Sequence, residues 1–233
     1  MSTAHQNSPA EYRQIRFRPP DGATELLLIR HGESARATDG ATFPLVDGHS
    51  DPELAPEGIE HAESLGRRLA SERIDTLYVT TLRRTVQTAH PLALRLGLTP
   101  HVEPDLREIY LGEWEGGLLR KYVAERHPLA LRMREQQRWD VIPGAESMEA
   151  LNARVRAGVE RIVATHPGQR VAVFSHGGII ATLLSIASGS EPFAFETVDN
   201  GSISEVVVSG SNWTVRRFND TAHLGTPTRV DET

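Results

Sequence analysis

Residues 25–34, ELLLIRHGES, decide the fold, because they form an apolar run that stops at a positive charge, a histidine and a glycine. A short apolar run of this kind is typical of a strand buried on both faces of a parallel sheet. Residues 170–178, RVAVFSHGG, repeat the design. The carboxyl ends of parallel strands share one edge of a sheet, where α/β proteins build their sites. We therefore expect His31 and His176 to lie close together at that edge.

The rest of the chain alternates between short apolar runs and stretches with helical periodicity. We expect another buried strand at residues 75–79 and helices at residues 55–70, 82–96, 147–166 and about 178–187. Residues 202–208 and 213–218, separated by SGSN, indicate a β-hairpin. This order predicts an α/β fold, a three-layer α/β/α sandwich with a mostly parallel sheet, an antiparallel edge strand and a small helical cap.

The length of 233 residues suits one domain of ordinary size. We place that domain at residues 23–225, with the cap at about 112–145, where the pattern is helical and lacks a strand signal. Residues 1–22 are polar up to a Pro-Pro pair and are predicted to form a flexible N-terminal arm. Residues 226–233 are predicted to form a flexible tail.

Composition excludes several classes of function. The net charge of −6 argues against a nucleic-acid binder, which would carry a basic face. The chain has no cysteine, which rules out disulfides and a cysteine nucleophile. No apolar run approaches the roughly 18 residues that a membrane span requires. The N-terminal residues lack the apolar segment of a signal peptide, so we expect a cytoplasmic protein without membrane partners.

Arginines accompany the two histidines. Arg30 precedes His31, and Arg84 follows the strand predicted at residues 75–79 and opens a helix. A helix N-terminus with an arginine beside it attracts anions. Two arginines and two histidines at one edge make a site for a tetrahedral dianion, and such a pocket stabilises a phosphoryl group during transfer.

A histidine in that pocket can act as a nucleophile if it is neutral. Surrounding positive charge lowers its pKa and keeps the lone pair available. The leaving alkoxide then needs a proton, which a nearby carboxylic acid can supply. Glu108 is our candidate among 31 acidic residues. Glycines at the strand ends let backbone approach a ligand closely. The substrate-binding set comprises Arg30, Gly32, Ser34, Arg84, His176 and Gly177.

Six segments, in order, resemble the histidine phosphatase superfamily, in the branch similar to cofactor-dependent phosphoglycerate mutases and broad-specificity phosphatases. They are RHGES at residues 30–34, GHSDPEL with PEG at 48–58, LRRTVQTA at 82–89, LRE with GEWEG at 106–116, PGAES at 143–147 and SHGG at 175–178. Any one of these motifs is weak evidence, and six in the family's order are specific. The resemblance covers roughly residues 25–220.

The resemblance implies a role for each catalytic residue. His31 becomes the phosphohistidine and Glu108 donates the proton, while Arg30, Arg84 and His176 bind the phosphoryl group. No metal or other cofactor is needed in this family. The partner implied is a small phosphorylated substrate, and a homodimer is an open option.

Departures from the mutases favour a phosphatase. Ala37 and Gly178 stand where mutases usually carry Asn, and the stretch between Glu108 and His176 is shorter than theirs. Thr85 replaces a usual Ala, which we interpret as a local packing change. We expect substrate specificity to lie in residues 36–46 and in the cap.

Several alternatives stay open at this point. A phosphoglycerate-mutase-type phosphotransferase would use the same intermediate. A serine hydrolase built on Ser175 lacks the first glycine of the Gly-x-Ser-x-Gly elbow. A non-catalytic phosphate-binding or scaffold protein would be expected to lose a catalytic residue, and this chain keeps all five. Arg36 could touch substrate or solvent. Five aromatic residues could line the pocket mouth or fill the cap core: Phe43, Tyr110, Trp114, Tyr122 and Trp139.

Overall fold

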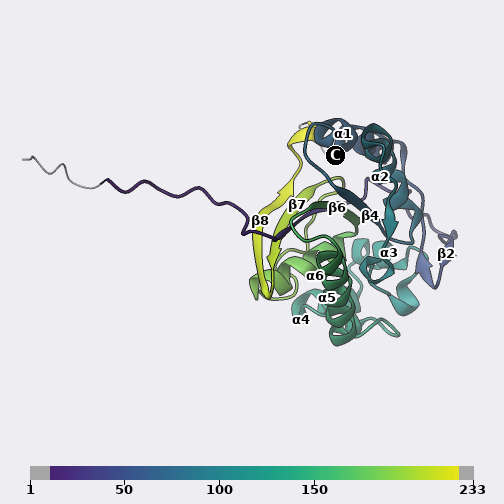
Figure 1. Ribbon diagram of the computed structural model, residues 1–233. Coiled ribbons are helices and arrows are strands. Elements are labelled where there is room, and N and C mark those ends of the chain that lie inside the picture. The colour runs from purple at the N-terminus through teal and green to yellow at the C-terminus, as the bar shows by residue number, and fades with distance from the viewer. Residues whose placement is uncertain (1–10, 226–233) are drawn as a thin grey trace, which may run out of the picture.

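The computed structural model describes residues 11–225, which form a six-stranded sheet between two layers of helices (Figure 1). The strand order is β5-β4-β6-β1-β7-β8. The strands are β1 (Thr24–Arg30), β4 (Thr76–Val79), β5 (His101–Val102), β6 (Arg170–Ser175), β7 (Ile203–Ser209) and β8 (Asn212–Asp220). β1, β4, β5 and β6 are parallel, and β7 and β8 form the antiparallel edge. The predicted fold class is confirmed.

The two central strands carry the two histidines. β1 and β6 pair in parallel, and the last pair in register is Arg30 with Ser175. His31 and His176 therefore follow neighbouring strands at the same level of the same edge. The apolar side chains of β1 alternate between the two faces of the sheet, as the period of two in a strand requires. Leu26 and Leu28 belong to one core cluster, and Leu27 and Ile29 belong to the other.

Four long helices cover the sheet. α1 (Pro56–Leu69) and α2 (Arg83–Leu96) pack on the face of Leu27, and α5 (Met148–Thr165) and α6 (Gly177–Ser188) pack on the face of Leu26. Figure 1 shows the first pair above the sheet and the second pair below it. The four predicted helices and the predicted hairpin agree with the observed elements to within a few residues.

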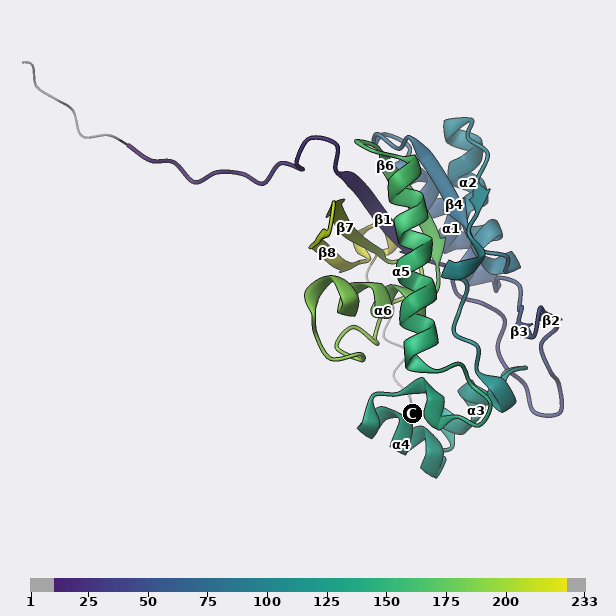
Figure 2. The same cartoon turned by 60° about the horizontal axis from the view of Figure 1, so that its bottom comes forward.

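Short helices form the cap beyond the carboxyl edge, below the sheet in Figure 2. They are η2 (Gly112–Trp114), α3 (Leu118–Ala124), α4 (Pro128–Gln136) and η3 (Trp139–Val141). The cap has its own small core, made by Trp114, Ala130, Met133 and Ile142. Leu111 and Trp139 pack against both this core and the cluster that contains Leu26, so the cap is joined to that face of the sheet.

Some short elements were not expected. β5, the hairpin β2 (Leu45–Val46) with β3 (His49–Ser50), η1 (Pro104–Leu106) and η4 (Ala222–Leu224) have two or three residues each. Elements of this length carry no readable periodicity. They matter here because β3 and η1 lie beside residues of the candidate site.

Two glycines let the His31 loop contact α1. A Cβ atom on Gly58 would lie 1.9 Å from the Glu33 carbonyl oxygen, and one on Gly32 would lie 2.4 Å from the Gly58 carbonyl oxygen. Real Cβ atoms do not approach other atoms this closely. The turn after β1 therefore takes its position from contact between backbone and backbone.

The chain ends were predicted to be flexible. Residues 11–20 are exposed, have no helix or strand, and run away from the domain in Figure 1. Residues 1–10 of the predicted arm and the predicted tail at 226–233 lie outside the described residues. Both segments stay predictions. Among residues 11–225, no helix has the length and apolar character to cross a bilayer.

Candidate active site

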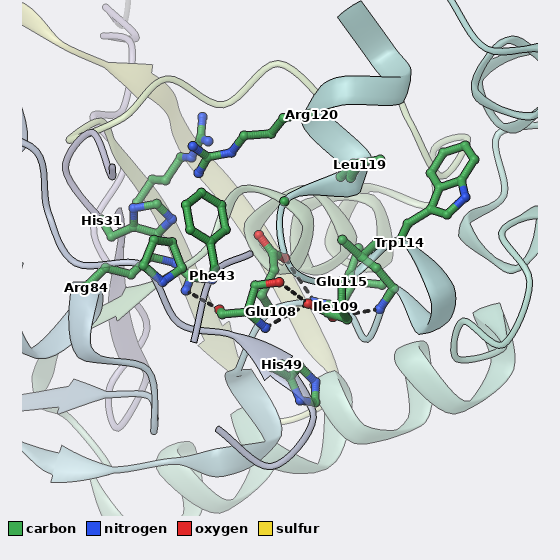
Figure 3. A pocket seen from close by; sticks show the side chains of 15 residues that line it. His31, Phe43, His49, Arg84, Glu108, Ile109, Trp114, Glu115, Leu119 and Arg120 are labelled. Carbon is green, nitrogen blue, oxygen red and sulfur yellow. Dashed lines mark hydrogen bonds between the residues drawn. The ribbon is translucent and has the colours of Figure 1, made fainter. Parts of the chain in front are cut away.

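A cavity of about 230 Å³ opens at the carboxyl edge of the sheet, between the sheet and the cap (Figure 3). It is lined by Arg30, His31, Phe43, His49, Ser50, Pro52, Arg84, Glu108, Ile109, Leu111, Trp114, Glu115, Gly117, Leu119 and Arg120. Four of the five predicted catalytic residues line this cavity. The fifth, His176, packs against His31, with ring centroids 5.3 Å apart.

His31 is held as a neutral imidazole with one nitrogen free. Its Nδ1 lies 2.7 Å from the Gly32 carbonyl oxygen. A carbonyl oxygen can only accept, so Nδ1 carries the proton and Nε2 keeps its lone pair. The ring is 4 % exposed. Burial, and then the charges of Arg84 and Arg30, hold the pKa of His31 well below its usual value.

His176 caps the N-terminus of α6 and is fully buried. Its Nε2 lies 2.9 Å from the Thr80 hydroxyl, and its Nδ1 has no partner among the described residues. Burial and the charge of Arg84 lower the pKa of His176 strongly. Thr85 is more than the packing change we expected, because its hydroxyl lies 3.1 Å from that of Thr80. The pair Thr80 and Thr85 thus orients His176.

Both predicted arginines are held by carbonyl oxygens, and Arg84 is buried whereas Arg30 is partly buried. Arg84 donates to the Ser50 carbonyl oxygen at 2.8 Å, and Arg30 donates to that of Val198. Burial lowers the pKa of Arg84 to about 10, which keeps the guanidinium charged at neutral pH. The Nε of Arg30 is buried and has no partner among the described residues. The site therefore keeps unused donors for an anion.

Glu108 is a partly buried residue whose carboxyl group lies in a cavity lined by arginines. Burial raises the pKa of Glu108, and Arg84 acts in the opposite direction. The Ile109 amide donates to its Oε1 at 3.0 Å. A Cβ atom on Gly178 would lie 2.8 Å from that same oxygen, so the first turn of α6 leaves room for the carboxyl group. A carboxyl group with a raised pKa can hold a proton and release it to a leaving group.

The other predicted substrate-binding residues make internal contacts. The Gly32 amide donates to the Thr88 hydroxyl at 3.0 Å, and the Ser34 hydroxyl accepts from Arg120 at 2.7 Å. Gly177 packs against Arg30, where a Cβ atom would lie 3.2 Å from Nε. These three residues do not line the cavity, and their contact with substrate stays a prediction.

Arg120 is the main cavity residue that the sequence interpretation missed. It comes from α3 of the cap, donates to the Ala35 carbonyl oxygen at 2.8 Å as well as to Ser34, and lies 5.3 Å from the centroid of the Phe43 ring. Figure 3 shows its guanidinium group directed toward His31. A single arginine in a helix of the cap carries no signal in the sequence alone.

Glu115 and Ser50 form a support for Arg84 that was also missed. Glu115 accepts from the Ser50 amide at 2.7 Å and from the Leu111 amide at 3.0 Å. The carbonyl oxygen of Ser50 in turn orients Arg84. The GEWEG motif contained the signal, because its second glutamate is the one that lines the cavity.

The structure bears on the open questions about other residues. Arg36 is exposed and lies outside this cavity, but it lines a second cavity that adjoins this one, so its contact with substrate stays a prediction. Phe43 and Trp114 line the cavity, whereas Tyr122 packs on Trp114 at 4.9 Å and Trp139 packs on Phe193 at 5.0 Å. The expected aromatic set is therefore divided between the pocket and the cap core.

Two other chemistries find no support in this part of the chain. The Ser175 hydroxyl is 1 % exposed and donates to the Leu106 carbonyl oxygen at 2.8 Å, so it is not presented as a nucleophile. Residues 11–225 contain no group of three or more His, Cys, Asp or Glu side chains that could hold a metal ion.

Comparisons with known proteins agree with this geometry. The family model described as "Histidine phosphatase superfamily (branch 1)" matches residues 26–221. Phosphoglycerate mutase-like protein 4 of Arabidopsis thaliana is 32% identical over 205 residues, which cover 86% of each chain. The metal-independent phosphoserine phosphatase of the same plant is 30% identical over 206 residues, which cover 86% of this chain and 83% of the relative. The solved structure of a mycobacterial glucosyl-3-phosphoglycerate phosphatase has a TM-score of 0.70 and 26% identity, and the match covers 85% of this chain and all (100%) of that one.

The state of His31 can be tested without substrate. NMR of the protein with 15N-labelled histidine should show His31 neutral, with the proton on Nδ1, at pH 6. Because the pKa in the folded state lies below that of the unfolded chain, the unfolded chain binds a proton first as the pH falls below about 6.5. His31 should therefore make the protein less stable in that range. A His31 signal that titrates near pH 6.5 would contradict the assigned state.

Proposed function

This chain belongs to branch 1 of the histidine phosphatase superfamily, and we propose that it hydrolyses a small phosphorylated metabolite through a phosphohistidine on His31. The observation that carries the proposal is the free Nε2 of His31 in a buried cavity that also contains Arg30, Arg84 and Glu108. Phosphatases among the similar proteins support hydrolysis as the reaction.

The first step transfers the phosphoryl group to the enzyme. Nε2 of His31 attacks phosphorus, and the bond between phosphorus and the ester oxygen breaks. Glu108 gives its proton to the departing oxygen, so the product leaves as a neutral alcohol. Arg30, Arg84 and His176 stabilise the charge on the three other oxygens of the phosphoryl group.

The second step returns the enzyme to its starting state. Water attacks phosphorus, Glu108 accepts a proton from that water, and the bond between phosphorus and Nε2 breaks with its electron pair returning to the ring. Inorganic phosphate then leaves. One carboxyl group therefore acts first as an acid and then as a base, which the opposing effects of burial and Arg84 on the pKa of Glu108 favour.

A phosphoglycerate-mutase-type phosphotransferase is the second candidate, supported by the similarity to phosphoglycerate mutase-like protein 4. The packing around Gly178 favours hydrolysis instead. A Cβ atom there would lie 2.4 Å from Ile109 Cδ1 and 2.8 Å from Glu108 Oε1, so the Asn expected of a mutase at this position would require both side chains to shift.

A second cavity, of about 770 Å³, adjoins the first and supports a site for the leaving group. It shares Gly117 and Arg120 with the catalytic cavity. Its other lining residues are Glu33, residues 36–42, Gly116, Leu118, Lys121, Ala124 and Glu125. Its walls carry charged groups of both signs, including the ion pair of Lys121 with Asp39 at 2.8 Å. We propose that a polar leaving group passes Arg120 and enters this cavity.

The proposal also includes the cytoplasmic location and the homodimer raised by the sequence. Light scattering after gel filtration would separate a dimer from a monomer of 25.7 kDa.

Product analysis tests hydrolysis directly. We expect the enzyme, incubated with 3-phosphoglycerate and with other phosphomonoesters, to release inorganic phosphate, because water enters the open cavity and hydrolyses the intermediate. Phosphate and 2-phosphoglycerate are measured in the same samples. Rapid formation of 2-phosphoglycerate without phosphate release would instead establish the mutase.

Arg120→Ala tests the role of the cap arginine. Its charge lies on the route from the catalytic cavity to the second cavity, so we expect KM for polar phosphomonoesters to rise by about tenfold, a typical loss for a charge-assisted hydrogen bond. The value of kcat for p-nitrophenyl phosphate should change by less than about threefold, since Arg30 and Arg84 remain. Arg132→Ala is the matched control, because Arg132 is an exposed arginine of the cap helix α4 and lines neither cavity. An unchanged KM in the Arg120 variant would argue against this role.

A further inference from the structure

The segment that carries Glu108 has little regular structure of its own. η1 ends at Leu106 and the next helical turn begins at Gly112, so residues 107–111 depend on other groups for their hydrogen bonds. The carboxyl group of Glu108 has one hydrogen bond within the described residues, from the amide of Ile109. Its position therefore follows the position of this backbone.

Arg154, on α5, holds that backbone from the outside. Its Nη1 donates to the carbonyl oxygens of Asp105 at 2.7 Å and Arg107 at 2.8 Å. Its Nη2 donates to the carbonyl oxygen of Glu108 itself at 3.2 Å. A planar guanidinium group with fixed donors suits this task, because one side chain reaches three carbonyl oxygens in one geometry.

Glu146 completes the arrangement. Its Oε2 accepts from Arg154 Nε at 2.8 Å, and its Oε1 accepts from the Tyr110 amide at 2.8 Å. The side chains of Arg154 and Glu146 are 20% and 13% exposed, so the pair is largely removed from solvent. The backbone is thus held on both sides of Glu108, at residues 105–108 by Arg154 and at residue 110 by Glu146.

We propose that Arg154, oriented by Glu146, is a positioning residue for the proton donor Glu108. Neither Arg154 nor Glu146 lines the catalytic cavity, so they act on the reaction through Glu108. They hold its backbone, and the charge of Arg154 also lowers its pKa, which Arg154→Lys preserves and Arg154→Met removes. This inference rests on the proposed function, in which Glu108 protonates the leaving group.

Substrates with different leaving groups distinguish a positioning role of Arg154 from an effect on the stability of the protein alone. An alkyl phosphate releases a strongly basic alkoxide that requires the proton from Glu108, whereas p-nitrophenolate is a weak base and leaves without it. A displaced Glu108 therefore slows the alkyl ester selectively. A loss of folded protein slows both substrates equally.

The experiment compares kcat/KM for glycerol 2-phosphate and p-nitrophenyl phosphate in Arg154→Met and Arg154→Lys. We expect Arg154→Met to lose about 100-fold on the alkyl ester, the effect of a misplaced proton donor, and less than about fivefold on the aryl ester. Arg154→Lys should recover part of the loss on the alkyl ester. The melting temperature of each variant is measured alongside.

Arg161→Met is the matched control. Arg161 lies two turns further along α5. It pairs with the carboxylates of Glu103, at 2.7 Å, and Asp105, which precede Glu108 in the chain, and it makes no contact with Glu108 itself. This variant should lose stability without a selective loss on the alkyl ester. If Arg154→Met does not fold, Glu146→Gln and Arg154→Lys carry the same comparison.

Equal losses on the two substrates, or the same selectivity in Arg161→Met, would overturn the inference. Glu108→Gln distinguishes this failure from failure of the proposed function. If Glu108→Gln loses the alkyl ester selectively and Arg154→Met does not, then only the role of Arg154 is wrong. If Glu108→Gln loses equally on the alkyl and the aryl ester, Glu108 is not the proton donor. In that case the proposed function itself is wrong about the proton transfer.

Discussion

The hydrogen bond from His31 Nδ1 to the Gly32 carbonyl oxygen is the interaction on which the site depends. It leaves the lone pair of Nε2 free inside a cavity whose lining includes three arginines. The bond requires the turn after β1 to be held in place, and the close contact of Gly32 with Gly58 on α1 supplies that constraint. The order of the sheet then brings His176 beside His31, because β6 is the direct neighbour of β1. The turn after β1 therefore fixes both the position of His31 in the fold and the ring nitrogen that is free to react.

The environment of the cavity shifts the pKa values of His31 and Glu108 in opposite directions. Burial together with Arg84 and Arg30 lowers the pKa of His31, and burial raises the pKa of Glu108. These shifts favour a neutral His31 with a free lone pair on Nε2, and they favour the protonated form of Glu108 more than in water. The arginines are held by carbonyl oxygens and form no ion pair within residues 11–225, so their guanidinium groups can pair with an anion that enters.

Much of this arrangement could be predicted from the sequence. Apolar runs that end in His-Gly identified β1 and β6, and the parallel sheet required His31 and His176 to share an edge. Arg120 could not be predicted, because its place depends on how the cap folds over the sheet, and Ser50 acts through a backbone carbonyl that any residue carries. Thr85 looked like a packing change until its hydroxyl proved to contact Thr80. The local pattern of apolar and polar residues predicts strands and helices, whereas contacts between elements distant in the sequence can be seen only in the structure.

The central claim is that His31 accepts the phosphoryl group. Rapid acid-free quenching of the enzyme during turnover, followed by peptide mass spectrometry, measures it most directly. The account predicts one phosphate on His31, stable in base and labile in acid, and no adduct in His31→Ala. A phosphate on another residue, or undiminished turnover in His31→Ala, would contradict it.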